Sequence, residues 1–323
     1  MEQGEERVTS LALLFPGQGS QAVGMLDAFM DEGVVKSTLD EASDALGYDL
    51  GRLITENPDD KLNRTEYTQP ALLTASMALL RLWQQRGGPR PIHVLGHSLG
   101  EYSALVAAGV LDFSEAVKLV AFRGKVMNDA VPAGTGSMAA VLGLEDSVVE
   151  QLCKQASGQD SQVWPANYNC PGQLVVAGHA QAVDKLIELA REAGAKRAMK
   201  LAVSVPSHTP LMQKAAEAMV DRLSAVDMHE PTCAVWSNAE ARPLEATHEI
   251  RSALAKQLVS PVRWTESIQR LISGTAVTVV EMGPGKVLSG LMRRIDRHVP
   301  VYSTASPDEF GKALGAFEEG VQA

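Results

Sequence analysis

The stretch Gly96 to Gly100, Gly-His-Ser-Leu-Gly, constrains the possible folds of this chain more than any other segment. An apolar run, 92–95, precedes it, and a helix-compatible segment, 101–108, follows it. A serine between glycines at a strand–turn–helix junction is typical of a nucleophile elbow, because glycines let the strand and helix backbones approach closely. The first turn of such a helix also offers free N–H groups to an oxyanion. The pattern therefore predicts a nucleophilic Ser98 in preference to a tight structural turn.

The composition limits the classes of protein to which the chain can belong. Its 323 residues include 39 acidic and 29 basic side chains, which give a formal net charge of −10, and only 5% are aromatic. Such a chain is poorly suited to bind nucleic acid or an anionic membrane. Residues 1–7 lack the apolar core of a secretory signal, and no apolar run approaches the ~20 residues that span a bilayer.

The cysteines add an expectation about the compartment. Cys153, Cys170 and Cys233 are far apart in the sequence and lack Cys-x-x-Cys spacing. This pattern predicts neither a disulfide framework nor a metal site, and it favours a cytoplasmic protein.

The order of predicted elements indicates one fold inserted into another. Strands (8–15, 92–95, 234–236, 276–281) alternate with helices (69–86, 114–130, 208–225, 250–258, 265–272) in a pattern typical of a parallel sheet covered on both faces. Between them, strand 137–142, helix 146–156, strands 162–167 and 173–177, helix 180–193 and strand 196–201 follow the ferredoxin-like order. We therefore expect an α/β-hydrolase-like domain (1–133 and 204–323), an inserted ferredoxin-like subdomain (134–203), and a site in the cleft between them.

A serine hydroxyl needs a base to accept its proton, and His208 is the best placed of the seven histidines. It lies where the insertion rejoins the larger domain, and it is predicted to open a helix. His97, beside the serine, is expected to point away and give local support. In ordinary α/β-hydrolases the histidine lies near the C-terminus and follows an acidic residue, whereas no carboxylate between Ser98 and His208 stands out here. This order speaks against an ordinary esterase and leaves room for a Ser–His dyad oriented by a carbonyl.

Six blocks of sequence, in order, resemble the malonyl-CoA:acyl-carrier-protein transacylase family. They are Phe-Pro-Gly-Gln-Gly-Ser-Gln (15–21), Gly-His-Ser-Leu-Gly-Glu-Tyr (96–102), Asn-Tyr-Asn-Cys-Pro-Gly-Gln (167–173), Val-Pro-Ser-His (205–208), Gln-Leu-Val-Ser-Pro-Val-Arg-Trp (257–264) and Gly-Pro-Gly-Lys-Val-Leu (283–288). The resemblance covers nearly the whole chain.

The resemblance implies a role for each matching residue. Ser98 corresponds to the acyl-accepting nucleophile and His208 to its general base. The backbone N–H groups of Gln18 and Leu99 correspond to the oxyanion hole. Arg123 corresponds to the arginine that holds the free carboxylate of the malonyl group, for which its planar fork is well suited.

Three further residues are expected at the substrate-binding cleft. The backbone carbonyl of Gln257 corresponds to the group that orients the histidine in place of a triad acid. Asn167 falls near the cleft by the same resemblance, and His97 is grouped with it as a substrate-binding candidate.

The implied reaction moves a malonyl group from malonyl-CoA, through a seryl ester, to the phosphopantetheine thiol of holo acyl-carrier protein in fatty-acid biosynthesis. Neither metal nor bound cofactor is expected: the glycine-rich stretches 17–19 and 283–286 fit neither the dinucleotide fingerprint nor a phosphate-cradling loop. The chain is expected to act as a monomer. The alternatives are a serine esterase or thioesterase, a polyketide-pathway or malonate-decarboxylase acyltransferase, and a non-enzymatic docking subunit.

Overall fold

The computed structural model describes residues 10–203, 205–274 and 276–318. Within these residues, six strands form the larger sheet, in the order β10-β9-β1-β2-β7-β8. The strands are β1 (Ser10–Phe15), β2 (His93–Gly96), β7 (Ala234–Trp236), β8 (Pro243–Leu244), β9 (Val277–Glu281) and β10 (Val301–Ser303). The pairs from β10 to β7 are parallel and only the short β8 is antiparallel, which confirms the predicted parallel-sheet α/β core.

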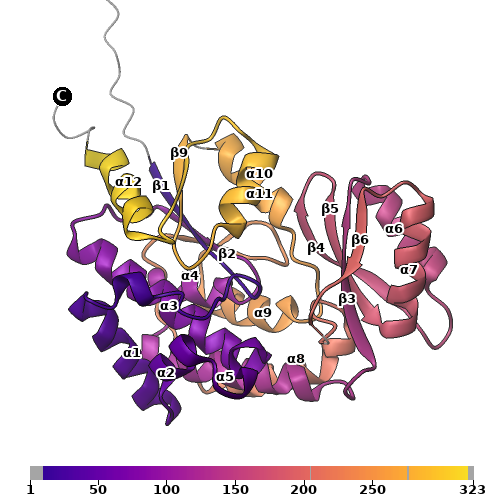
Figure 1. Ribbon diagram of the computed structural model, residues 1–323, viewed down its shortest axis with the longest axis horizontal. Coiled ribbons are helices and arrows are strands. Elements are labelled where there is room, and N and C mark those ends of the chain that lie inside the picture. The colour runs from indigo at the N-terminus through magenta and orange to yellow at the C-terminus, as the bar shows by residue number, and fades with distance from the viewer. Residues whose placement is uncertain (1–9, 204, 275, 319–323) are drawn as a thin grey trace, which may run out of the picture.

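Helices cover both faces of this sheet (Figure 1). They are α1 (Gly33–Leu46), α2 (Leu50–Glu56), α3 (Thr65–Gln85), α4 (Gly100–Ala107), α5 (Phe113–Asp129), α8 (Gln213–Ser224), α9 (Thr247–Gln257), α10 (Trp264–Gly274), α11 (Val287–Ile295) and α12 (Pro307–Glu318), with short 3₁₀ turns at Asp27–Phe29, Pro58–Asn63 and Pro210–Met212. Alternate residues of β1 face opposite layers: Leu13 packs in the core with α1, α3 and α5, and Leu14 packs in the core with α10 and α11. A strand buried on both faces needs a continuous apolar sequence, as this one has.

The smaller sheet lies to the right of the larger one in Figure 1. Its strands are β3 (Gly136–Leu142), β4 (Val163–Cys170), β5 (Gln173–His179) and β6 (Arg197–Lys200), in the antiparallel order β4-β5-β3-β6. Helices α6 (Asp146–Ala156) and α7 (Ala180–Glu192) complete the β-α-β-β-α-β order of a ferredoxin-like unit. Ala139 and Val141 pack with these helices, whereas Met138 and Ala140 belong to the opposite face, which lines a cavity.

The elbow between β2 and α4 depends on close backbone contact. A Cβ atom added at Gly96 would lie 1.8 Å from the carbonyl carbon of Gly100, and one added at Gly100 would lie 2.0 Å from the carbonyl oxygen of Phe15. Ser98, between these glycines, has φ of +53°, in the left-handed region that non-glycine residues rarely adopt. The glycines are therefore required by the crossing of strand and helix, and Ser98 stands at the strained point of the turn.

The predicted elements agree with the observed ones except at a few boundaries. β4 extends to Cys170, so the hairpin turn is limited to Pro171 and Gly172. His208 does not open a helix: it lies in a loop, and α8 begins only at Gln213. The physical reason is Pro210, which forces the preceding residue into an extended conformation. Residues 8 and 9 of the first predicted strand lie outside the described residues.

Within the described part of the chain, no helix is both long enough and apolar enough to cross a bilayer.

Candidate active site

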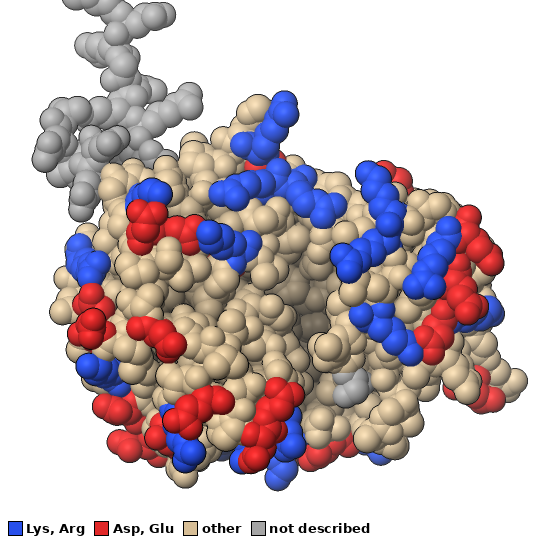
Figure 2. Space-filling view, viewed as in Figure 1, with Lys and Arg blue, Asp and Glu red and all other residues tan. Residues whose placement is uncertain are grey.

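A cavity of about 280 Å³ lies between the carboxyl edge of the larger sheet and the inner face of the smaller one. The loop after β1, the elbow after β2, helix α5, strand β4, the loop before α8 and the start of α11 all contribute to its lining. Figure 2 shows the hollow on this face of the molecule. The predicted site residues Gln18, His97, Ser98, Leu99, Arg123, Asn167 and His208 line it, and Gln257 lies directly behind it.

Ser98, His208 and Gln257 form a chain of hydrogen bonds. Nδ1–H of His208 donates to the carbonyl oxygen of Gln257 at 2.8 Å. This partner assigns the proton to Nδ1, so Nε2 is free to accept the hydroxyl hydrogen of Ser98 across 2.8 Å. The arrangement is that of a nucleophile, a base and an orienting group, with a peptide carbonyl in the place of an acid.

The surroundings of His208 keep its imidazole neutral. Burial, followed by the positive charge of Arg123, lowers its pKa from the ordinary 6.5 to about 3. The hydrogen bond to Gln257 acts in the opposite direction but is outweighed. A neutral imidazole is the form that can accept a proton from serine, so His208 is in the competent state over the whole physiological pH range.

Arg123 is a buried cation held by uncharged partners. It is 1% exposed, with Nη1 donating to Oε1 of Gln69 and Nη2 to Oε1 of Gln257, both at 2.8 Å. Its guanidinium lies over the ring of Tyr102, with Cζ 5.4 Å from the centroid, and Nη2 reaches within 3.4 Å of Ser98 Oγ. Among the described residues no carboxylate forms an ion pair with it, and its Nε has no acceptor. Because a buried charge without a counter-ion is costly, this cation is suited to receive an anionic ligand beside the serine.

Two backbone N–H groups at the cavity are free to bind an oxyanion. Within the described residues neither Gln18 nor Leu99 has an acceptor for its N–H, and both residues line the cavity. The N–H of Ser98 is already committed to Oδ1 of Asn238 at 2.6 Å. The side chain of Gln18 is directed to Thr65, 3.4 Å away, so only its backbone is available to the oxyanion. This geometry supports the expected oxyanion hole.

His97 in the elbow and Asn167 in β4 lie where the two sheets meet at the cavity. Nε2–H of His97 donates to Oδ1 of Asn169 at 2.8 Å, and its ring packs 5.4 Å from that of Trp264. His97 therefore ties the elbow to β4. Oδ1 of Asn167 is buried and has no partner among the described residues, which leaves it available to a ligand.

Three polar residues of the site were not singled out from the sequence. Gln69 holds Arg123, and Asn238 holds the elbow. Glu101, 2% exposed, accepts from Nε2 of Gln257 at 2.7 Å and from the N–H of Asn238 at 3.2 Å. The available signal for Glu101 was its position three residues after Ser98, one helical turn along α4.

Burial changes the protonation of Glu101. Desolvation raises its pKa from 4.5 to about 7, although hydrogen bonds from Gln257 and Asn238 and the charge of Arg123 partly offset the effect. In the structure this carboxyl group takes part in the hydrogen-bond network of Gln257 and Asn238.

A serine hydrogen-bonded to a buried imidazole, beside two N–H groups with no acceptor among the described residues, is the arrangement of enzymes that carry acyl groups on serine. The acyl transferase domain model matches residues 12–304, and the chain belongs to this family.

Named relatives align over almost the entire chain. The malonyl CoA-acyl carrier protein transacylase of Escherichia coli (strain K12) is 47% identical, over 95% of this chain and 99% of its own. The structure of the enzyme of that name from Coxiella burnetii is 42% identical, with a TM-score of 0.93 over 96% of this chain and 98% of its own. A malonyl-transacylase solved with a type II PKS acyl-carrier protein is 44% identical, with a TM-score of 0.93 over 95% and 100% of the two chains.

The raised pKa of Glu101 predicts a pH-dependent effect of Glu101→Gln on stability. Between about pH 4.5 and 7 the folded protein keeps a proton that the unfolded chain has lost, so the free energy of unfolding falls as pH rises through this window. The variant has no such proton to lose. We therefore expect its free energy of unfolding, relative to that of the parent, to be higher at pH 8 than at pH 5. Urea denaturation at both pH values measures the difference. Glu188→Gln, at an exposed position on α7, controls for the loss of one charge. Equal differences at the two pH values would contradict the assignment.

Proposed function

We propose that this chain transfers the malonyl group of malonyl-CoA, through an ester on Ser98, to the phosphopantetheine thiol of an acyl-carrier protein in fatty-acid biosynthesis. One observation carries the proposal: a buried guanidinium with no ion-pair partner among the described residues lies 3.4 Å from the hydroxyl oxygen of a serine that is hydrogen-bonded to a neutral imidazole. The malonyl thioester has the matching pair of groups, a carbonyl to be attacked and a carboxylate to be held.

In the first half-reaction Ser98 Oγ attacks the thioester carbonyl while Nε2 of His208 accepts its proton. The N–H groups of Gln18 and Leu99 stabilise the oxyanion of the tetrahedral intermediate. The carbon–sulfur bond then breaks, His208 returns the proton to the departing CoA sulfur, and the malonyl ester remains on Ser98.

The second half-reaction is the reverse of the first with a different thiol. The phosphopantetheine sulfur gives its proton to His208 and attacks the seryl ester, and the Ser98 oxygen leaves as it regains the proton. Throughout both halves the carbonyl of Gln257 holds the imidazole tautomer, and Arg123, with Asn167 and His97 in the cavity lining, holds the acyl group.

Incubation with malonyl-CoA alone tests the proposal. We expect mass spectrometry of the intact protein to show one added malonyl group, located on Ser98 and removed when holo acyl-carrier protein is added. Ser98→Ala is the control and should remain unmodified. Rapid release of free malonate, without a stable adduct, would identify a thioesterase instead. Transfer only to the acyl-carrier protein of a polyketide synthase would place the enzyme in polyketide biosynthesis instead of fatty-acid biosynthesis.

Removal of the Arg123 guanidinium should change the choice of acyl group. A charge-assisted hydrogen bond contributes about 1.5–3 kcal/mol, so Arg123→Ala should lower kcat/KM for malonyl-CoA roughly tenfold to a hundredfold. Transfer from acetyl-CoA should persist or increase, because the loss of the positive charge also lets the pKa of His208 rise. Parallel kinetics with the two thioesters measure the split, and equal losses for both would refute the carboxylate clamp.

The mouth of the cavity offers a surface for an acidic carrier protein. Figure 2 shows Lys and Arg side chains on either side of the hollow. One cluster comprises Lys196, Arg197 and Lys200 around β6, and the other comprises Lys286, Arg293, Arg294 and Arg297 around α11. Lys200 and Lys286 are paired with Asp184 and Glu309, whereas the other members of both clusters are exposed and form no ion pair among the described residues. We therefore expect both clusters to contribute charge to docking.

Charge reversal of the β6 cluster should weaken the use of the carrier protein. In K196E/R197E the KM for holo acyl-carrier protein should rise roughly tenfold at low salt, and the increase should shrink as salt screens the charges. The rate of Ser98 malonylation by malonyl-CoA alone reports whether the site is intact. Lys36→Glu, on α1 away from the cavity, is the matched control. An unchanged KM at low salt would remove this cluster from the docking face.

We propose 1–133 with 204–323 as the catalytic domain and 134–203 as the inserted subdomain, since the smaller sheet and its two helices fall within 136–200.

All proposed site residues come from one chain, which supports action as a monomer. The three free cysteines support a cytoplasmic location. The proposed chemistry uses only side chains and backbone groups of this chain, with no cofactor.

A further inference from the structure

The side chain of Asn238 lies directly behind the elbow that carries Ser98. Strand β7 runs parallel to β2, with His93 opposite Ala234 and Val94 opposite Val235. The loop after β7 therefore leaves the sheet at the same edge as the elbow, and Asn238 is the second residue of that loop. It is 4% exposed and does not line the cavity.

The carboxamide of Asn238 pairs with the peptide groups on both sides of His97. Its Nδ2–H donates to the carbonyl oxygen of Gly96, and its Oδ1 accepts the N–H of Ser98, each at 2.6 Å. In a longer sheet the backbone of a neighbouring strand would supply this donor and this acceptor. Here the side chain of Asn238 supplies them, just beyond the end of β2. The pairing restrains the left-handed φ of Ser98, which would otherwise relax toward a commoner conformation.

This pairing also determines which N–H groups face the cavity. Because the N–H of Ser98 is bound to Asn238, the next N–H along the chain, that of Leu99, is the one left free at the start of α4. The direction of Ser98 Oγ toward His208 and the exposure of the Leu99 N–H thus depend on the same backbone conformation.

The backbone of Asn238 is fixed as firmly as its side chain. Its N–H donates to Oε2 of Glu101 at 3.2 Å, and its carbonyl oxygen accepts the N–H of Arg263 at 3.0 Å. With every polar group of Asn238 in a hydrogen bond, the carboxamide has one orientation available to it.

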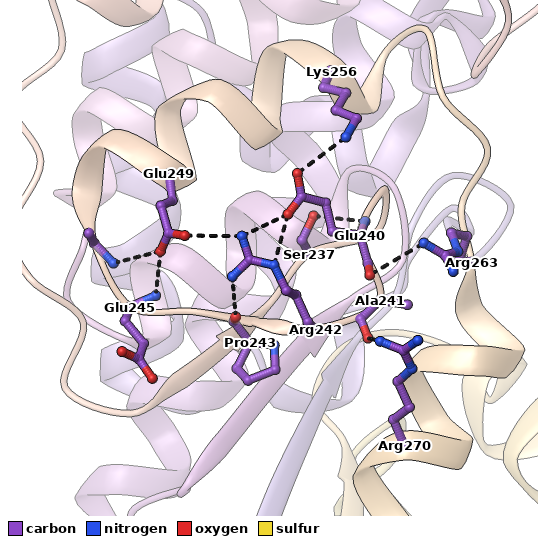
Figure 3. A network of polar contacts seen from close by, with 11 residues as sticks. Ser237, Glu240, Ala241, Arg242, Pro243, Glu245, Glu249, Lys256, Arg263 and Arg270 are labelled. Carbon is purple, nitrogen blue, oxygen red and sulfur yellow. Dashed lines mark hydrogen bonds and ion pairs between the residues drawn. The ribbon is translucent and has the colours of Figure 1, made fainter.

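A surface network supports the loop from outside (Figure 3). Glu240 forms ion pairs with Arg242 at 2.8 Å and with Lys256 at 3.3 Å, and Arg263 donates to the Glu240 carbonyl at 3.4 Å. Lys256 immediately precedes Gln257, so the network holds the Asn238 loop and the end of α9 in one arrangement.

We propose that Asn238 is a positioning residue for acyl transfer, whose carboxamide holds Ser98 in the conformation that directs Oγ to His208 and frees the Leu99 N–H for the oxyanion. The inference rests on the proposed role of Ser98 as nucleophile. Asn238 does not line the cavity, so its loss should lower the rate of reaction and leave the binding of malonyl-CoA unchanged.

The primary test compares Asn238→Ala with the parent enzyme. We expect kcat for malonyl transfer to fall about 100-fold, the size of effect that a misplaced reacting atom produces, while KM for malonyl-CoA stays within about twofold. The rate at which a small sulfonyl fluoride modifies Ser98 should fall in parallel. This second measurement reports on Ser98 even if malonyl-CoA proves not to be the substrate, so it separates failure of this inference from failure of the proposed function.

Asn238→Asp, which has the same shape, provides a signature that loss of stability alone would not give. Its carboxylate still accepts the Ser98 N–H, but its second oxygen opposes the Gly96 carbonyl until a proton converts it into a donor. The charged or titratable groups nearby are His97, between the two paired peptide groups, Glu101 on α4, Glu240 in the same loop, Arg263 before α10, and Arg123, which donates to Gln257 at the end of α9. We expect the rate relative to the parent to rise as pH falls from 8 to 5.

Ser237→Ala is the matched control in the same loop. It removes the hydroxyl that accepts the N–H of Glu240 at 3.3 Å but leaves the Asn238 carboxamide in place. Its Tm should fall while its kcat and sulfonyl fluoride rate stay near those of the parent. If Asn238→Ala does not fold, the pH response of Asn238→Asp decides the question. Parental kcat in both Asn238 variants, or equal loss of kcat in Ser237→Ala, would overturn the inference.

Discussion

Gln257 joins the parts of the site that come from distant regions of the chain. Its backbone carbonyl accepts from His208, its side-chain oxygen accepts from Arg123, and its side-chain nitrogen donates both to Glu101 and to the carbonyl of Ser98. It is fully buried at the last position of α9. Because one residue meets the nucleophile, the base and the cation, a small displacement of α9 would change all three relationships together.

The neutrality of this central residue explains how the site can hold a buried arginine and still leave it open to a ligand. A carboxylate in place of the Gln257 side chain would pair with Arg123 and occupy the position that a substrate anion needs. Instead the carboxamide orients the guanidinium without neutralising it. Glu101 lies on the other side of that carboxamide, and its raised pKa of about 7 further limits the negative charge that Arg123 experiences.

The reacting groups could be predicted from the sequence more completely than the groups that hold them in place. Ser98 was recognisable because its turn requires glycine on both sides, and such a requirement is local. The resemblance supplied Arg123, which alone reads as a solvated helix residue, and the structure buries it. The helix predicted to begin at His208 was wrong, because the effect of Pro210 on its neighbour outweighs the helical pattern around it.

Asn238 and Gln69 could not have been found in the same way. Each acts through a contact between elements that are far apart in the sequence, 140 residues for the Asn238–Ser98 pair and 54 for Gln69–Arg123. No local pattern records such a pairing. The β-α-β-β-α-β order of the insertion was predictable because its period and turn residues are local, whereas the way its inner face completes the cavity depends on packing.

The electrostatics of the dyad connect recognition of the acyl group with its transfer. A peptide carbonyl opposite Nδ1 orients His208 but supplies no full negative charge to stabilise an imidazolium, which a triad acid would provide. Arg123 makes that protonated form still less favourable, as the low pKa of His208 indicates. A carboxylate bound to Arg123 would offset this charge at the moment when His208 must accept the serine proton. On the proposed mechanism, the malonyl group therefore contributes to the basicity that its own transfer requires, and an acyl group without a carboxylate does not.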